Sequence, residues 1–212
     1  MRKYRNDMNF QEFRKEFFET ICFTSHQVNT WYPGFDKNNL GRWVKKEYLV
    51  KLRNGYYSFP EYLENPDYAL YVANRIYKPS YISLHSALSF YGLISESIVQ
   101  ITSVSPLKTA TFTNQFGQYV YHTIHPELLF GYDLKPFANK LNLHLAKPEK
   151  ALLDLLYIYP FYREVEDLNE LRLDEELIHE LINPELLKEY VQNFKNMALE
   201  NRVSNLIKAY EI

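Results

Sequence analysis

The stretch from Leu49 to Phe59 reads LVKLRNGYYSF, and its Asn54-Gly55 pair decides the fold of the N-terminal third. An Asn-Gly pair between two alternating runs predicts a β-hairpin with a two-residue type I′ turn, because both turn residues must take positive φ. The turn also predicts a register, in which the facing pairs are Arg53 with Tyr56, Leu52 with Tyr57, Lys51 with Ser58, and Val50 with Phe59. We therefore expect one apolar face that packs (Val50, Leu52, Tyr57, Phe59) and one basic face open to solvent (Lys51, Arg53, Tyr56, Ser58).

Three helices are predicted before this hairpin. Residues 10–23 carry apolar side chains at three-and-four spacing, which favours an amphipathic helix. Thr24, with Gln27 in the capping-box position, predicts the start of a second, short helix that Pro33-Gly34 ends. Asp36 is expected to cap a third helix over residues 37–46, whose Leu40, Trp43 and Val44 share one face.

Three helices followed by a basic hairpin is the order typical of a winged helix-turn-helix, which we expect over residues 1–60. In that fold the third helix enters the major groove and the hairpin contacts flanking phosphates. Arginine and asparagine can read base edges, lysine contributes charge, and an exposed tyrosine could stack on a base or sugar. The predicted DNA-binding residues are Lys37, Asn38, Arg42, Lys45, Lys46, Lys51, Arg53 and Tyr56.

Charge is distributed unevenly along the 212 residues, although the net charge is only −2. Residues 1–60 contain eleven Lys and Arg against six Asp and Glu, whereas residues 161–212 contain six against twelve. A basic N-terminal third on an acidic remainder indicates a nucleic-acid-binding head with a body of a different role.

The composition excludes several classes of protein. With 46% hydrophobic and 24% charged residues the chain can bury a core, so we exclude disorder throughout. Cys22 is the single cysteine, which rules out an intramolecular disulfide and a thiolate metal cage, and we expect it to be a small buried residue. No segment resembles a signal peptide or a membrane span, so we expect a cytoplasmic protein without membrane contact.

Residues 61–212 are expected to form a mixed α/β domain with an acidic helical tail, giving an α+β protein overall. A helix is predicted over 68–76, followed by one that Ser83 caps and Gly92 ends. Strands are predicted over 98–104, 109–114, 118–124 and 141–146, and Pro148 is expected at the first position of a buried helix. Beyond Pro160 the chain is predicted to be helical, with Asn183 as a further cap.

The sequence favours a protein that is not an enzyme. Ser83, Ser86, His85 and Asp154 could be drawn as a hydrolytic triad, but no Gly-x-Ser-x-Gly elbow accompanies them. His122 and His125 would lie on opposite faces of a strand, and no nearby residues complete a metal site. No Gly-rich phosphate loop occurs either. We therefore predict no catalytic residue, no metal and no cofactor.

Three segments resemble the AbiEi antitoxin family, the regulator half of bacterial type IV toxin-antitoxin modules. The segments are residues 42–59 (the Arg42-Trp43-Val44-Lys45-Lys46 helix and the hairpin), 81–94 (YISLHSAL, ending Gly-Leu-Ile) and 146–154 (AKPEKALLD). The resemblance covers nearly the whole chain. One departure is Glu47, where such sequences often read Lys-Gly; glycine there would end the recognition helix with positive φ.

The resemblance implies a repressor that binds repeats in double-stranded DNA of its own promoter, with two modules on two half-sites. It also implies a C-terminal domain that helps to counteract a nucleotidyltransferase toxin without forming a stable complex with it. Two alternatives stay open on the residues alone. One is a winged helix that docks proteins; the other is a nuclease-like body targeted by the head, although no metal-holding Asp with Glu-x-Lys is found.

Overall fold

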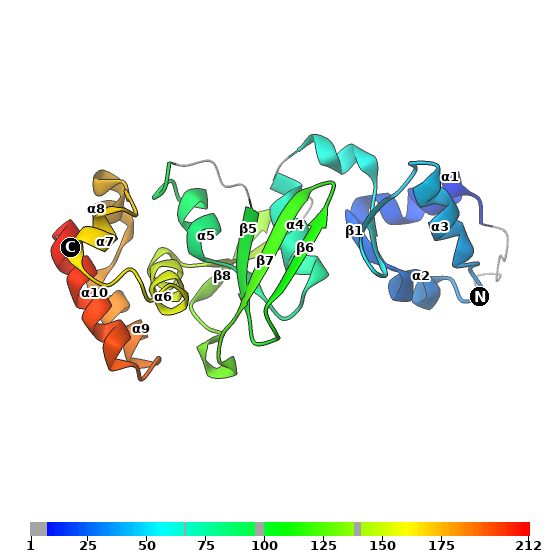
Figure 1. Cartoon of the computed structure of the whole chain (residues 1–212). Coiled ribbons are helices and arrows are strands. Elements are labelled where there is room, and N and C mark those ends of the chain that lie inside the picture. The colour runs from blue at the N-terminus through cyan, green and yellow to red at the C-terminus, as the bar shows by residue number, and fades with distance from the viewer. Residues whose placement is uncertain (1–7, 66, 96–99, 138–140) are drawn as a thin grey trace. The chain divides into compact units, whose positions relative to one another are not determined.

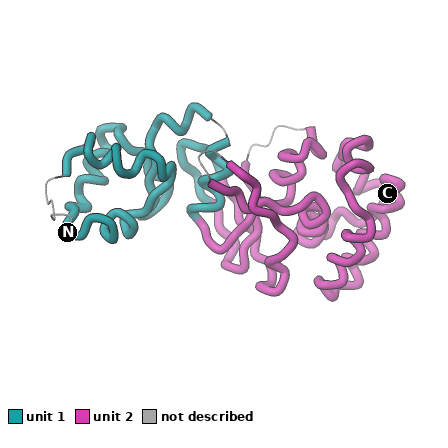
Figure 2. Tube along the Cα trace, turned by 180° about the vertical axis from the view of Figure 1, so that it is seen from behind, with its two compact units in different colours: residues 1–76, 112–118 teal, residues 77–111, 119–212 magenta. Residues whose placement is uncertain are grey.

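The computed structural model describes residues 8–65, 67–95, 100–137 and 141–212, and the chain divides into two compact units. Unit 1 comprises residues 1–76 and 112–118, and unit 2 comprises residues 77–111 and 119–212 (Figure 2). Helices and strands occur in both units (Figure 1), so the expected α+β class is confirmed.

Unit 1 combines helices with a small antiparallel sheet of strand order β1-β3-β2. Its elements in chain order are α1 (Phe10–Phe17), η1 (Phe18–Thr20), β1 (Cys22–Thr24), α2 (Ser25–Trp31), α3 (Asn38–Lys45), β2 (Val50–Arg53), β3 (Tyr56–Ser58), η2 (Pro60–Glu64) and α4 (Asp67–Ile76). Thr24 Oγ1 accepts the backbone N–H of Gln27 at 3.0 Å, which confirms the predicted cap of α2.

The first helix ends earlier than the apolar spacing predicts. Ile21 has φ 59°, a left-handed conformation that stops the helical segment, and Cys22 begins β1 instead. The side chain of Ile21 is nevertheless fully buried. Its apolar character therefore marks a core position, and its helical spacing from Phe17 and Phe18 does not mean that the helix continues to it. β1 pairs with β3 as the third strand of the small sheet, which the sequence analysis missed. Cys22 is buried, as expected.

The hairpin turns at Asn54-Gly55 as predicted, but the predicted type I′ geometry and the predicted register are wrong. Gly55 has φ 79°, whereas Asn54 does not take the positive φ that a type I′ turn requires. Arg53 faces Tyr56 as expected, whereas a bulge at Leu52 makes Lys51 face Tyr57 and Val50 face Ser58. A bulge inserts one unpaired residue, so all pairs beyond it move by one. The predicted exposure of Ser58 is therefore wrong: this residue is fully buried, and its Oγ donates to the carbonyl of Ile21 at 2.6 Å.

The first unit extends past the expected boundary between residues 60 and 61. In the structure the boundary lies between Ile76 and Tyr77. Tyr62 in η2 is buried, its hydroxyl donates to the carbonyl of Phe18 at 2.7 Å, and its ring stacks on that of Phe18. Removal of the Tyr62 hydroxyl from solvent is the main cause that raises the pKa of Tyr62 to about 12. The hydroxyl therefore stays protonated and can donate. These contacts fix η2 against the first helical segment.

Unit 1 has an aromatic core centred on Phe13, which is fully buried. Its ring lies 4.5 Å from the ring centroid of Phe17, 4.8 Å from Trp43 and 5.6 Å from Phe35. Aromatic pairs at such separations add to the free energy gained by burying their large surfaces. Because Trp43 lies in α3, this core fixes which face of α3 points outward.

Unit 2 is built on a mixed sheet that helices cover, although residues 112–118, where two of the strands connect to each other, belong to unit 1. Its elements are β4 (Tyr81–Ile82), α5 (Leu84–Phe90), β5 (Gln100–Ser105), β6 (Ala110–Asn114), β7 (Gly117–Thr123), η3 (Pro126–Leu128), β8 (Tyr132–Phe137), β9 (Leu141–Ala146), α6 (Pro148–Ile158), α7 (Val165–Asn169), α8 (Glu175–Leu181), α9 (Pro184–Gln192) and α10 (Met197–Tyr210). The strand order is β6-β7-β5-β4-β9-β8, and β4 pairs with β9 in parallel. α6 lies between α5 and the C-terminal helices α9 and α10 (Figure 1).

Most of the predicted elements of unit 2 are present, but β4 and β8 were not predicted. Gly92 ends α5 with φ 79°, Pro148 opens α6, and the side chain of Asn183 caps α9, all as expected. Residues 98–99 of one predicted strand lie outside the described residues. Among the described residues, no helix is long and apolar enough to cross a membrane.

Ser83 does not have the expected capping role, although it occupies the position before α5. Its Oγ donates instead to Asp154 Oδ2 at 2.7 Å, within a fully buried network. Tyr81 also donates to that oxygen at 2.9 Å, and Lys150 donates both to the hydroxyl of Tyr81 at 2.8 Å and to Asp154 Oδ1. The network joins the two segments of unit 2 that carry the family resemblance.

Candidate nucleic-acid interface

α3 is an amphipathic helix whose outer face is polar and mostly cationic. Leu40 and Trp43 are buried on the inner face. The exposed residues on and beside α3 are Lys37, Asn38, Gly41, Arg42, Lys45 and Lys46, followed by Glu47 and Tyr48. At about 100° per residue, Asn38, Gly41, Arg42 and Lys45 fall on one stripe, with Lys37 and Lys46 at its two edges. The structure therefore brings together the five helix residues predicted from the sequence.

The N-terminal end of α3 holds Arg42 in place. Asp36 Oδ1 accepts the backbone N–H of Asn38 at 3.0 Å, but the helix begins one residue later than expected, so Lys37 and not Asp36 occupies the cap position. Arg42 Nη1 donates to Asn39 Oδ1 at 2.9 Å and lies 3.5 Å from Asp36 Oδ2. The Arg42 side chain is still 64% exposed, so its remaining donors face solvent.

Gly41 is a feature of this face that the sequence analysis did not single out. A Cβ at this position would meet nothing within 4 Å, apart from its chain neighbours and the backbone of its own helix. Glycine in a helix interior costs about 1 kcal/mol relative to alanine. Here the missing side chain leaves room for a phosphate or a base edge to approach the helix backbone.

α3 ends at Lys45, and Glu47, two residues further on, has φ 60°. The left-handed conformation that a glycine would adopt after the helix is thus present, with glutamate in its place. The backbone N–H of Glu47 donates to the carbonyl of Val44 at 3.0 Å, which closes the last turn. The departure at Glu47 therefore leaves the helix end intact, at the energetic cost of a side chain in a left-handed conformation.

We expect Glu47→Gly to stabilise unit 1 by about 1 kcal/mol, because glycine adopts positive φ without the Cβ clash. Both tryptophans lie in α2 and α3, so fluorescence during urea unfolding reports on this unit. Glu47→Ala is the control, since it removes the carboxylate and keeps the Cβ. Equal stabilisation by both variants would show that the carboxylate, not the backbone, is unfavourable here.

On the hairpin, the structure separates Lys51 from Arg53. Lys51 is exposed on β2. Arg53 is half-buried, its Nη1 donates to the carbonyl of Ile76 at the end of α4, and its guanidinium lies 4.6 Å from the ring centroid of Phe112. The guanidinium also lies 5.3 Å from the ring of Tyr56, which is itself half-buried. Both side chains are thus used inside unit 1.

That Arg53 and Tyr56 contact DNA stays a prediction, although both side chains already have partners within unit 1. The Asn54-Gly55 turn is held by further bonds, since Gly55 accepts the N–H of Ser25 at 2.9 Å and Leu52 accepts Asn114 Nδ2 at 3.1 Å. The hairpin end is therefore packed against the unit and does not project freely. No local pattern links Arg53 to Ile76 or Phe112, so only the tertiary structure could reveal this role.

The residues weighed as catalytic or metal-binding have structural contacts in unit 2. Asp154 bonds to Ser83, Tyr81 and Lys150, whereas the His85 ring lies against Tyr159, 5.6 Å between centroids. The hydroxyl of Tyr159 also lies 3.2 Å from Nε2 of His122. Burial lowers the pKa of the His122 imidazole. Within the described parts of the chain, no group of three or more His, Cys, Asp or Glu could hold a metal.

One solved structure resembles this chain along almost its whole length. It is the Rv2827c protein from Mycobacterium tuberculosis, with a TM-score of 0.55 and 14% sequence identity, covering 98% of this chain and 80% of that one. At this identity the likeness concerns the fold alone. No protein-family model and no curated protein matches the chain.

Proposed function

We propose that this protein is a DNA-binding transcriptional repressor whose reading head is α3. The single observation that carries the proposal is the exposed stripe of α3, which presents Asn38, Arg42 and Lys45 around Gly41 with no bulky apolar side chain. An α-helix fits the major groove of B-DNA, where arginine and asparagine discriminate guanine and adenine. Lys37, Lys46 and Lys51 would contact phosphates.

The arrangement of unit 1 supports this proposal. Its order of three helices and a hairpin, with β1 completing the sheet, matches a winged helix-turn-helix in which α2 and α3 are the paired helices. The bonds of Arg42 to Asp36 and Asn39 hold its guanidinium against the helix before any DNA arrives. A preorganised contact residue loses less conformational entropy on binding.

The biological role proposed is that of the antitoxin of a type IV toxin-antitoxin module. In this role the protein represses its own operon by binding promoter repeats as two modules and counteracts a nucleotidyltransferase toxin without a stable complex. The proposal rests on the resemblance of residues 42–59, 81–94 and 146–154 to AbiEi antitoxins. A repressor acts on the DNA that contains its operator, so the proposed role is a cytoplasmic one.

We expect Arg42→Ala to weaken binding to the promoter repeats by about 1–3 kcal/mol, while binding to random DNA falls much less. The reason is that arginine forms bidentate hydrogen bonds to guanine, which a random sequence offers only by chance. Gel-shift titration against both DNAs, at one fixed salt concentration, measures the difference.

Lys51→Ala is the matched control, because a phosphate contact carries no sequence information and its loss should weaken both DNAs alike. Equal losses on both DNAs for Arg42→Ala would show that another residue reads the bases. A fully folded protein that retains no DNA at low salt would instead favour a winged helix that docks proteins.

A further inference from the structure

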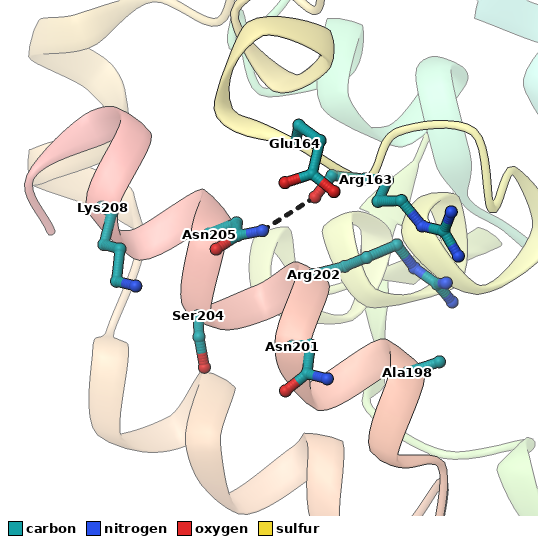
Figure 3. Close-up of a pocket in the computed structure, with 8 residues that line it drawn as sticks. All are labelled: Arg163, Glu164, Ala198, Asn201, Arg202, Ser204, Asn205 and Lys208. Atoms are coloured by element: carbon teal, nitrogen blue, oxygen red, sulfur yellow. Dashed lines mark hydrogen bonds between the residues drawn. The ribbon is translucent and has the colours of Figure 1, made fainter.

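The C-terminal helices contain a hollow that the DNA-binding role does not use. It has a volume of about 370 Å³ and lies between the segment that starts α7 and the outer face of α10 (Figure 3). Its lining residues are Arg163, Glu164, Ala198, Asn201, Arg202, Ser204, Asn205 and Lys208. Residues 161–212 have twelve acidic and only six basic side chains, yet three of the six basic ones line this hollow.

Arg202 is the decisive residue. It is only 6% exposed, and its Nε is buried with no hydrogen-bond partner. Burying a charged donor without a partner is costly, so such a group in a native protein calls for an explanation such as a missing ligand. Nε itself is closed off from solvent, so Arg202 lines the hollow through other atoms of its side chain, and a bound molecule would reach the guanidinium through its two terminal nitrogens.

A second guanidinium increases this unbalanced charge. Figure 3 shows the guanidinium groups of Arg163 and Arg202 next to one another, and the charge of Arg163 adds to burial in lowering the pKa of Arg202. Across the described ranges of the chain, neither guanidinium forms a salt bridge or a side-chain hydrogen bond. Asn205 Nδ2 donates to the carbonyl of Arg163 at 2.9 Å, which fixes the backbone from which Arg163 extends.

Two carboxylates lie at the start of α7. Asp167 Oδ2 accepts the backbone N–H of Glu164 at 3.0 Å, whereas the carboxylate of Glu164 belongs to a residue that lines the hollow. Asp167 Oδ2 also accepts the N–H of Arg163 at 3.2 Å, and these backbone bonds lower the pKa of Asp167. Asp167 thus serves the helix start, and the lining of the hollow keeps an excess of positive charge, since Arg163, Arg202 and Lys208 outnumber the one lining carboxylate of Glu164.

We propose that this hollow binds the phosphate group of a phosphorylated small molecule, with Arg163 and Arg202 as the two cationic ligands. A dianionic phosphate balances two guanidiniums and offers enough acceptors for both, whereas a carboxylate would leave one positive charge over. The hollow is in the size range of small-molecule pockets and exceeds a bare phosphate ion. Asn201, Ser204 and Lys208 extend along α10 and are the contacts for the rest of that molecule.

The test is calorimetric titration of the full chain with inorganic phosphate, adenosine monophosphate and acetate, at constant ionic strength. We expect saturable binding of phosphate, tighter binding of the nucleotide, and none of acetate. Arg163→Gln should weaken binding of both phosphates about tenfold or more, since it removes a charge-assisted contact. Equal affinity for phosphate and nucleotide would mean that free phosphate is the ligand.

Two control variants separate this site from the proposed DNA interface. Lys188→Gln changes the same charge elsewhere in the acidic helices, and Arg42→Gln changes it on α3; both should leave phosphate affinity unaltered. If Arg42→Gln weakens phosphate binding and Arg163→Gln does not, the anion binds on α3 and the inference is overturned. No saturable binding by the wild-type chain, or saturable binding of acetate with the affinity of phosphate, would also overturn it.

Arg202 is tested through thermal stability, because a variant of a buried residue could fail to fold. Arg202→Met keeps the apolar stem and removes the unpaired charge, so without phosphate we expect its melting temperature to equal or exceed that of the wild type. Added phosphate should raise the melting temperature of the wild type only, by mass action. A marked loss of stability in phosphate-free buffer would show that the guanidinium is structural, and would contradict the proposal.

Discussion

Replacing Asp154 with alanine should destabilise unit 2 by about 3–5 kcal/mol, a large share of the free energy of unfolding of a typical domain. Asp154 is fully buried, and its two oxygens accept from Lys150, Tyr81 and Ser83. Its loss leaves the buried ammonium of Lys150 without a counter-charge. Urea unfolding followed by circular dichroism measures the effect.

The pKa shifts in this network agree with that expectation. Burial lowers the pKa of Lys150 against the opposing pull of Asp154, so the ammonium depends on the carboxylate to stay charged. Burial and then the Asp154 carboxylate raise the pKa of Tyr81 well above its usual value, so its hydroxyl stays protonated and donates. The Tyr81 ring also stacks on that of Tyr132, 4.8 Å between centroids.

Two controls make this prediction specific. Asp133→Ala removes a half-exposed carboxylate that lies near Lys135 and Lys147, and should change stability by less than about 0.5 kcal/mol. The double variant Lys150→Met with Asp154→Leu removes both charges and should recover much of the loss. A double variant no more stable than Asp154→Ala would show that the packing, and not the unpaired charge, determines the effect.

The second large effect concerns salt. Five cationic side chains of the proposed interface are exposed, namely Lys37, Arg42, Lys45, Lys46 and Lys51. If each neutralises one phosphate, the logarithm of the association constant should fall with the logarithm of salt at a slope of about −4.5 per module. Raising the salt from about 50 to 200 mM would then weaken binding by a factor of about 500.

Variants of this interface also test whether Arg53 contacts DNA. Lys45→Gln combined with Lys46→Gln should make the slope shallower by about 2, because each lysine lost leaves one fewer counterion to be released. Arg53→Gln should leave the slope unchanged, since its guanidinium is bonded to the carbonyl of Ile76. A slope near zero in the wild type would exclude binding through phosphates, and a shallower slope for Arg53→Gln would return that residue to the interface.

Local signals predicted the parts of the fold that local forces determine. The Asn54-Gly55 turn, the Thr24 cap, Gly92 and Pro148 each act within a few residues, and each has its predicted place. β1 was missed because three residues carry too little periodicity to be told from the end of a helix. β4 is shorter still and takes its pairing from β5 and β9, which lie far along the chain.

In the candidate interface too, the residues of α3 could be predicted from the sequence and the contacts of the hairpin residues could not. The stripe on α3 follows from helical periodicity, so its five residues could be named in advance. The hairpin residues could not, because the bulge at Leu52 and the bond from Arg53 to Ile76 depend on elements that are remote in sequence. The paired arginines of the C-terminal hollow are 39 residues apart, and only folding makes them neighbours.

The hydrogen bonds that hold the turn between β2 and β3 against the rest of unit 1 affect how this unit can meet DNA. A flexible loop can change its conformation to fit many duplexes, whereas a hairpin that is bonded at its turn keeps the same conformation with and without a ligand. We therefore expect the head to choose among DNA sites by how readily each duplex bends or narrows to meet a rigid surface. Its preferences would then extend to base pairs that no side chain touches.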